Sequence, residues 1–319
     1  MSSKSIIPIR IIDLRKKSVL SGNITGMGKC VMSKAVKNEV VIKQINANGM
    51  VFKCRTAGLG NGGEPIIFLH GFPESSIMWS KIMVELAAQG YQCVAPDQRG
   101  YSESARPKKN KDYTVDKLAS DVVAIADAFG FNKIHLVGHD WGAAVGWIVV
   151  QLYPNRINDW AALSIPHMKS FFDAKKYDPY QIEKSKYITK FQIPIMPELK
   201  VKAKDYKTLR ELWVVHSAEE VDDYLKILKP FSGRKAAFAW YRANNELSID
   251  CGDVYIPTLY IWGNDDLAIG RTSVEGTKQY MKGEYKFVEL NAGHWLMQEK
   301  YDDISEEITE HIKNHAIKD

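Results

Sequence analysis

From about residue 40 onward, short apolar runs alternate with amphipathic segments along the chain. Six apolar runs, bounded by Gly, Pro or Asp, cover residues 65–71, 91–97, 133–140, 160–166, 257–263 and 285–293. Runs of this length and composition are typical of buried parallel strands. Apolar residues spaced by three or four predict helices over 77–89, 115–129, 142–152 and 302–315. The alternation predicts an α/β fold in which helices cover both faces of a mostly parallel sheet.

Two further strands precede this alternation. The runs 40–48 and 50–58 are apolar or β-branched and meet at Asn48-Gly49. This dipeptide favours the tight turn of a β-hairpin, because both residues accept positive φ. We therefore expect an antiparallel hairpin at the start of the fold.

Residues 167–251 break the alternation. They contain no convincing strand, and helical stretches are expected near 180–191, 206–216 and 218–229, followed by the sequence KAAFAWYRANNE. A segment of about 85 residues is too long for a connection and too short for a typical separate domain. We predict a helical lid, or cap, over the carboxyl edge of the sheet, where open α/β sheets bind ligands. The fold core would then comprise residues 41–166 and 252–319.

The charge is concentrated at the start of the chain. The 319 residues carry 43 Lys+Arg and 38 Asp+Glu, a net charge of +5. Residues 1–40 hold eight basic and two acidic side chains, which is +6, so the remainder is near neutral. This distribution, without a groove-reading motif, argues against nucleic-acid binding. We interpret residues 1–40 as a basic N-terminal extension.

Two further sequence features bear on the class of protein. The longest uncharged apolar run, 141–154, is 14 residues, short of the roughly 18–20 that span a bilayer. The four cysteines lack the spacing of a metal site or a disulfide framework. We expect a cytoplasmic protein without a transmembrane segment, metal or cofactor, although the basic start leaves organelle targeting open.

The strand at 133–140 ends in the sequence GHDWGA (138–143), and a predicted helix follows at once. Small residues on both sides of a central polar residue allow a sharp turn from strand to helix, the geometry of a nucleophile elbow. The central residue here is Asp140 rather than Ser. An aspartate after a strand can also be a simple helix N-cap.

Two later strand ends supply the partners that a nucleophile needs. Asp266 follows the strand at 257–263, and His294 follows the last strand. The order nucleophile, acid, histidine is that of α/β-hydrolases. Upstream, the sequence HGFPE (70–74) follows a strand at the position that supplies an oxyanion-hole amide, here Phe72, while Trp141 supplies the second. The Phe72-Pro73 bond is a candidate cis peptide.

An aspartate nucleophile indicates the kind of substrate. A serine alkoxide attacking an sp³ carbon would leave an ether, which the site could not hydrolyse. A carboxylate forms an ester, and water activated by His294 can attack the ester carbonyl. Epoxides and alkyl halides are the leading substrate classes.

The motifs HGFPE, DQRGYSES (97–104), GHDWGA, WGxxD and GHW together resemble the epoxide hydrolases of the α/β-hydrolase fold, from about Val40 to the C-terminus. The resemblance implies two lid tyrosines that hold the epoxide oxygen, here Tyr187 and Tyr241. It also places the acid at Asp266, with Asp265 as the weaker candidate. The residues flanking these positions are candidates to line a pocket for a small hydrophobic epoxide: Phe191, Leu267, Trp295 and Met297.

Two other functions remain open from the sequence. Haloalkane dehalogenases share the Asp and His and often a Trp after the nucleophile, but they commonly carry Asn at the position of Phe72. Fluoroacetate dehalogenases carry Arg where Trp141 stands, and Trp141 therefore argues against fluoroacetate as the substrate. A non-catalytic binding protein of this fold is the alternative from another class. The epoxide's identity and the oligomeric state, monomer or homodimer, are not specified by the sequence.

Overall fold

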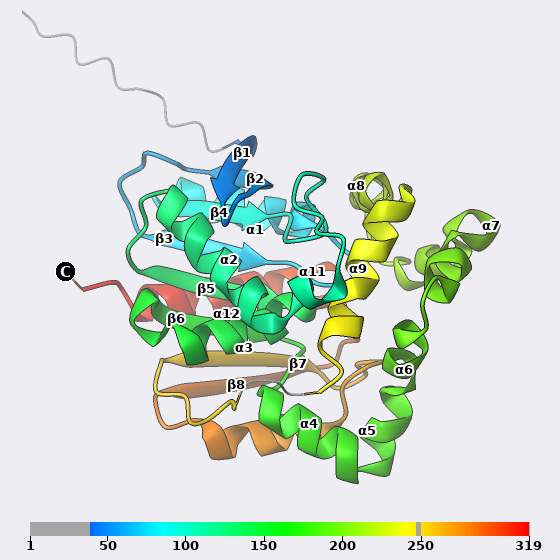
Figure 1. Ribbon diagram of the computed structural model, residues 1–319. Coiled ribbons are helices and arrows are strands. Elements are labelled where there is room, and N and C mark those ends of the chain that lie inside the picture. The colour runs from blue at the N-terminus through cyan, green and yellow to red at the C-terminus, as the bar shows by residue number, and fades with distance from the viewer. Residues whose placement is uncertain (1–38, 247–249, 319) are drawn as a thin grey trace, which may run out of the picture. The chain divides into compact units, whose positions relative to one another are not determined.

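The computed structural model of the protein describes residues 39–246 and 250–318. Within them a sheet of eight strands has the order β1-β2-β4-β3-β5-β6-β7-β8 (Figure 1). The pairs β1–β2 and β2–β4 are antiparallel, and every other neighbouring pair is parallel. The strands are β1 Val41–Ala47, β2 Met50–Ala57, β3 Pro65–Leu69, β4 Gln92–Pro96, β5 Ile134–His139, β6 Ile157–Leu163, β7 Thr258–Gly263 and β8 Tyr285–Leu290. The predicted mostly parallel sheet is confirmed.

The N-terminal hairpin forms where the sequence predicts it. Asn48 and Gly49 both have positive φ, 47° and 71°, and Ala47 pairs with Met50 across the turn. Positive φ at both central residues matches the right-handed twist of the paired strands. The turn therefore fixes the register of β1 on β2.

Helices cover both faces of the sheet. Helices α2 and α3 lie in front of it in Figure 1 and contribute to one buried apolar cluster, whereas α1 and α12 contribute to a second cluster. The helices outside the β6–β7 segment are α1 Ser80–Ala88, α2 Val115–Ala128, α3 Trp141–Leu152, α10 Arg271–Glu275, α11 Leu296–Glu299 and α12 Tyr301–Asn314. Short 3₁₀ turns are η1 Ser76–Trp79, η2 Asn110–Tyr113, η3 Pro154–Arg156 and η4 Gly276–Tyr280. The helix expected over 77–89 is thus divided into η1 and α1.

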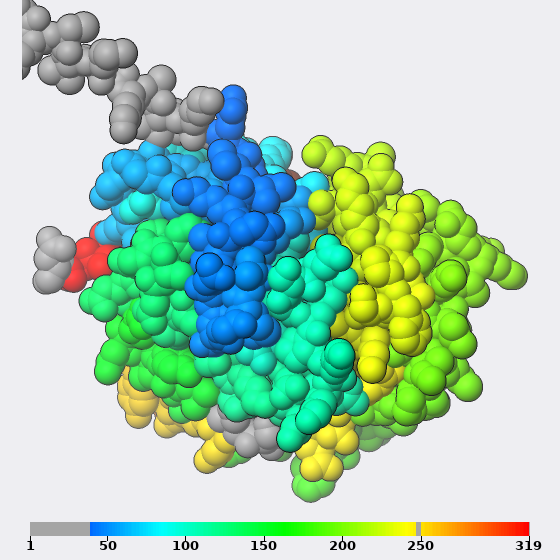
Figure 2. Space-filling model, turned by 45° about the horizontal axis from the view of Figure 1, so that its top comes forward, coloured from blue at the N-terminus to red at the C-terminus, as the bar shows by residue number. Residues whose placement is uncertain are grey.

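The segment between β6 and β7 contains a run of helices. They are α4 Met168–Tyr177, α5 Pro179–Lys184, α6 Lys186–Gln192, α7 Met196–Leu212, α8 Ala218–Leu228 and α9 Phe231–Ala243. In Figure 2 the yellow and yellow-green helices among them form the right-hand part of the surface in view. Helix α4 is absent from the sequence prediction, although Met168, Phe171 and Phe172 have helical spacing.

Helix α7 also differs from its prediction. It begins at Met196, ten residues before the expected start, because Pro197 occupies its first turn, where a missing amide hydrogen costs nothing. Residues 203–206 inside it are non-helical, and Lys204, Asp205 and Tyr206 have positive φ. The helix is therefore two short helices joined by a kink.

The sequence also predicts a basic N-terminal extension and no transmembrane segment. The basic extension predicted for residues 1–40 lies, apart from its last two residues, outside the described residues. Within residues 39–246 and 250–318, no helix combines the length and apolar character needed to cross a bilayer.

Candidate active site

Asp140 lies on a tight turn between β5 and α3. Its backbone has φ 50° and ψ −123°, a conformation that L-residues rarely adopt and that costs on the order of 1–3 kcal/mol. Glycines make the turn possible: a Cβ on Gly138 would lie 2.6 Å from the Gly142 carbonyl oxygen, and one on Gly142 would lie 2.1 Å from that of Leu69. The surrounding backbone therefore forces Asp140 into a strained, projecting position.

The Asp140 side chain makes no N-capping hydrogen bond to α3. Instead, its Oδ1 accepts a hydrogen bond of 2.7 Å from the backbone N–H of Phe72. A Cβ on Gly71 would come within 2.4 Å of that same Oδ1 atom. The loop after β3 thus closes directly over the carboxylate, which gives the simple N-cap interpretation no support.

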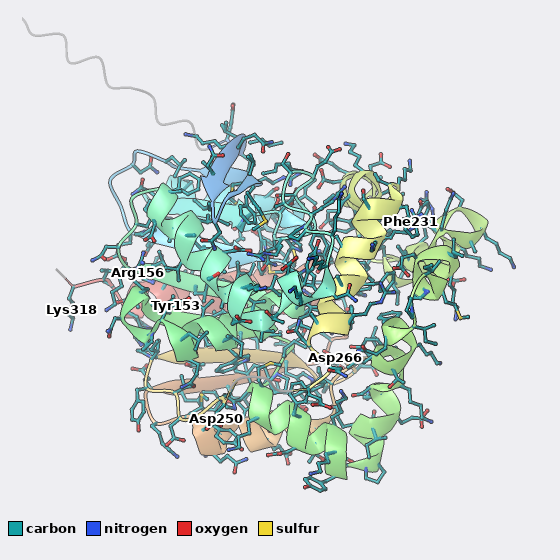
Figure 3. All side chains as sticks on the ribbon, viewed as in Figure 1. Tyr153, Arg156, Phe231, Asp250, Asp266 and Lys318 are labelled. Carbon is teal, nitrogen blue, oxygen red and sulfur yellow. The ribbon has the colours of Figure 1, made fainter. Side chains whose placement is uncertain are left out.

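The structure brings His294 and Asp266 to the other side of this carboxylate. His294 Nε2 lies 3.4 Å from Asp140 Oδ2, and His294 Nδ1 donates to Asp266 Oδ2 at 2.9 Å. Asp266 is itself fixed, because its Oδ1 accepts bonds from the amides of Ala268 and Ile269. Figure 3 labels Asp266 close to the C-terminal end of α9 in that view. The neighbouring Asp265 is exposed, so Asp266 is the acid that contacts the ring.

The surroundings of His294 favour its charged form. Burial alone would lower the pKa of the ring, but the charges of Asp266 and Asp140, and hydrogen bonds to both, outweigh it. The pKa of His294 is consequently held well above its ordinary value. The ion pair with Asp140 is part of this stabilisation, so the pKa depends on the charge of that carboxylate.

Tyr187 of α6 and Tyr241 of α9 lie across the cavity from Asp140. Their ring centroids are 6.1 Å apart, and both rings line the two cavities that Asp140 also lines. Burial, with smaller contributions from nearby acidic groups including Asp140, raises the pKa of each phenol. Both hydroxyls therefore stay protonated and are available as hydrogen-bond donors.

The cavity divides into two arms at Asp140 and the two tyrosines. One arm is lined by three of the predicted pocket residues, Phe191, Leu267 and Trp295, together with Leu212. The other arm is lined by Trp141 and by apolar residues that the sequence analysis did not single out: Val115, Ile148, Ile165, Met168, Phe171, Phe172 and Ile188. The helical spacing of Met168, Phe171 and Phe172 was the available signal for the second arm.

Met297 does not lie where the sequence analysis placed it. It lines neither arm and packs instead in the buried cluster that includes Leu296 and Ile304. Helix α11 begins directly after Trp295. Its first turn carries Met297 away from the cavity, so proximity in sequence to His294 is a poor guide there.

A buried polar cluster that was not predicted from the sequence lies next to His294. Glu74 accepts hydrogen bonds from His139 Nδ1 at 3.0 Å and from His216 Nε2 at 3.1 Å. Burial raises the Glu74 pKa, but these two histidines more than compensate and leave it lowered. His139 Nε2 lies 2.8 Å from the backbone oxygen of His294. The cluster therefore fixes the backbone that carries the candidate base.

The cis geometry considered for the Phe72-Pro73 bond is confirmed. It lies in the loop whose Phe72 amide contacts Asp140. The phenyl ring of Phe72 packs on Tyr241 and Phe191, with ring centroids 5.4 and 5.8 Å apart. This one residue thus contributes both its amide and its ring to the site.

The chain is similar to known proteins over most of its length. A profile of the alpha/beta hydrolase fold matches residues 64–301. The AB hydrolase superfamily protein YfhM of Bacillus subtilis is 32% identical over 278 residues, which is 85% of this chain and 97% of that protein. Epoxide hydrolase 4 of Homo sapiens is 30% identical over 289 residues, covering 86% of this chain and 79% of the human protein.

Solved structures show the same relationship. An epoxide hydrolase from Vigna radiata superposes with a TM-score of 0.74 at 26% sequence identity, covering 87% of this chain and 99% of that one. The family profile extends over the segments that carry Asp140, Asp266 and His294. The chain therefore belongs to the α/β-hydrolase fold family and, within it, to the epoxide hydrolases.

Proposed function

We propose that this enzyme hydrolyses hydrophobic epoxides to vicinal diols through a covalent ester on Asp140. One observation carries the proposal: the Asp140 carboxylate and the two protonated phenols of Tyr187 and Tyr241 line the same buried cavity. A carboxylate can attack an epoxide carbon, and a phenol can donate to the epoxide oxygen as the C–O bond breaks. The apolar lining of both arms suits hydrophobic substituents.

In the first half-reaction, Asp140 Oδ2 attacks a ring carbon. The carbon–oxygen bond of the epoxide breaks, and the oxygen leaves with the electron pair as an alkoxide on the same molecule. Tyr187 and Tyr241 hydrogen-bond this oxygen and supply its proton. Oδ1 stays on the Phe72 amide, so it becomes the carbonyl oxygen of the ester.

Formation of the ester removes the negative charge of Asp140. Since that charge is one of the causes that raise the His294 pKa, the pKa falls and the ring can release its proton. This proton replaces the one that the tyrosines gave to the alkoxide. His294 is thereby converted into a base only after Asp140 has reacted.

In the second half-reaction, neutral His294, oriented by Asp266, takes a proton from water as the water attacks the ester carbonyl carbon. The amides of Phe72 and Trp141 stabilise the resulting oxyanion. Collapse releases the diol and returns Asp140 as a carboxylate beside a protonated histidine. Protons and charges therefore balance over the cycle.

We also propose that residues 167–251 act as a cap. Helices α6 and α9 of this segment supply the two tyrosines, and α4 supplies apolar residues of the second arm. A cap built in this way excludes bulk water from the reacting atoms, which strengthens every electrostatic interaction inside. The core would supply nucleophile, acid and base, and the cap would supply the oxygen-binding groups.

A substrate panel tests the proposal against the haloalkane dehalogenase alternative. The purified enzyme is incubated separately with styrene oxide, a fatty-acid epoxide and 1-bromobutane, and diol and bromide are both quantified. We expect diol from at least one epoxide and negligible bromide release. Efficient bromide release without diol formation would favour the dehalogenase, and recovery of every compound unchanged would favour a binding protein.

A further inference from the structure

The start of helix α7 presents a cluster of exposed apolar side chains. Ile193, Ile195, Met196 and Leu199 are 44, 56, 61 and 57% exposed. We call these four residues the cap tip. Large apolar side chains at this exposure are common singly, but four within seven residues is a concentration of exposed apolar surface of the kind that marks an interaction site.

Buried residues next to the cap tip fix this segment to the rest of the protein. Pro197, Glu198 and Val201 of the same segment are buried, and both Glu198 carboxylate oxygens accept hydrogen bonds from Arg242 at 2.7 and 2.9 Å. Glu198 is thereby fixed on α9, whereas Met196 and Leu199, three positions apart on one side of the helix turn, are exposed. Their exposure is therefore a consequence of packing and not of a loose chain.

Basic side chains flank the cap tip. Lys200 lies one helical turn after Met196 on the same side. Lys202 follows two residues later, and Lys204 lies in the kink where the helix is interrupted. All three are exposed, and among residues 39–246 and 250–318 none of them has an ion-pair partner within 4.0 Å, the limit for a salt bridge. The nearby acids are engaged elsewhere: Asp205 pairs with Arg210, and Glu211 with Lys207.

We propose that the cap tip and these three lysines bind the surface of an anionic lipid bilayer. Apolar side chains that enter the acyl–headgroup boundary, flanked by lysines that reach anionic headgroups, are the two components of peripheral membrane binding. A second copy of this chain fits less well, because two such surfaces facing one another would bring like charges together. The proposal goes beyond the hydrolase function and does not depend on it.

Membrane binding through the cap tip would bring one cavity arm close to the bilayer. Phe191, only two residues before Ile193, lines the cavity arm that leads to Asp140. A hydrophobic compound dissolved in the bilayer would meet the protein beside this arm. Membrane binding would therefore reduce the distance that a poorly soluble molecule travels through water.

Vesicle flotation with the full chain tests the proposal. The probes are phosphatidylcholine vesicles with and without about 30% phosphatidylserine. We expect the wild-type protein to float with the anionic vesicles at low salt and to be released progressively as salt screens the lysines. The variant Ile195→Ser/Met196→Ser/Leu199→Ser should bind at least about tenfold more weakly, since three apolar side chains no longer enter the bilayer.

A second variant tests the contribution of the lysines to vesicle binding. Lys200→Gln/Lys202→Gln/Lys204→Gln should lose most of the preference for phosphatidylserine, by roughly fivefold for each lysine. Matched controls change exposed residues elsewhere: Val41→Ser/Ile42→Ser for the apolar set and Lys108→Gln/Lys109→Gln/Lys111→Gln for the basic set. Both controls should bind like wild type. Circular dichroism melting of every variant verifies that it is folded.

Three results would overturn the proposal. The wild-type protein could fail to float with anionic vesicles at low salt. Vesicle binding could persist in both cap-tip variants, which would assign it to another basic part of the chain such as residues 1–40. Light scattering could instead show a wild-type dimer that the Ile195→Ser/Met196→Ser/Leu199→Ser variant abolishes, which would identify the surface as a contact between copies.

Discussion

The backbone amide of Phe72 donates a 2.7 Å hydrogen bond to Oδ1 of Asp140, a residue 68 positions further along the chain. This contact makes the two carboxylate oxygens of Asp140 inequivalent. Oδ1 is held by an amide, whereas Oδ2 lies 3.4 Å from His294 Nε2. In the proposed mechanism, the attacking oxygen and the future carbonyl oxygen are therefore distinguished before any substrate binds.

A single turnover in oxygen-18 water should place the label in the side chain of Asp140. Hydrolysis at the ester carbonyl carbon transfers the water oxygen to the carboxylate, while the original Oδ2 leaves in the diol. Peptide mass analysis with enzyme in excess checks this, and the Asp266 peptide serves as the unlabelled control. Label in the first-turnover diol would mean that water attacks the epoxide directly.

Replacing His294 with Gln should leave ester formation possible and block its hydrolysis. The nucleophile and the phenols are untouched, but no side chain remains to take the proton of the attacking water. Intact-protein mass spectrometry should therefore detect a covalent increment equal to the mass of the epoxide. Asp140→Asn should show no increment under the same conditions, and a folded His294→Gln protein that is never alkylated would contradict the assigned role.

Removing one phenol hydroxyl should slow epoxide opening without preventing it. Tyr187→Phe or Tyr241→Phe should each cost about 1.5–3 kcal/mol of transition-state stabilisation, roughly tenfold to a hundredfold in rate. The double variant should be slower than either single variant, although coupled residues need not add. Tyr206→Phe, which changes a buried hydroxyl on α7 outside both cavity arms, is the matched control. Wild-type epoxide turnover in the double variant would show that the two phenols do not assist ring opening, and efficient bromide release by the wild type would favour the dehalogenase alternative.

Substituting Gly71 with Ala should damage the site through the nucleophile itself. The added Cβ would lie 2.4 Å from Asp140 Oδ1, so either the carboxylate or the loop that carries the Phe72 amide must move. We expect a loss of at least about a hundredfold in turnover, since small displacements of reacting groups have effects of this size. Gly252→Ala is the control, because the nearest atom to its Cβ would be 3.9 Å away. Comparable activity in both variants would show that the contact is easily relaxed.

The titration of His167 should lower the free energy of unfolding as the pH drops from 7 to 5, whereas His294, whose pKa is raised, acts in the opposite direction. Burial lowers the pKa of this ring from 6.5 to about 4. In this range the unfolded chain therefore binds more protons than the folded one, and acid favours unfolding. The contribution of one such group is on the order of 2 kcal/mol between pH 7 and 5.

Urea titrations of the wild type and of His167→Phe at both pH values measure this contribution. The variant keeps an aromatic ring beside Tyr280, on which His167 stacks, but cannot titrate. Its loss of stability between pH 7 and 5 should be smaller than that of the wild type. Some pH dependence should remain, because burial also lowers the pKa of His311 to about 4. Equal slopes in the two proteins would place the acid sensitivity elsewhere.

Local patterns in the sequence were sufficient to predict most of the core. The strand and helix alternation, the Asn48-Gly49 turn and the position of α3 depend on periodicity and backbone sterics within a few residues. Helix α4 and the kink of α7 were missed, because most of the stability of a protein helix comes from tertiary packing and not from its own sequence. Propensity alone is a weak guide for such elements.

The sequence by itself determined the order of Asp140, Asp266 and His294, each after a strand, and the glycines that shape the turn at Asp140. Only the tertiary structure decided that Asp266 rather than Asp265 contacts His294, that Met297 packs away from the cavity, and that Glu74 supports the site. The physical reason is separation along the chain. A turn is fixed by its own few residues, whereas the neighbours of a side chain depend on how segments as far apart as His139 and His294, 155 positions, pack together.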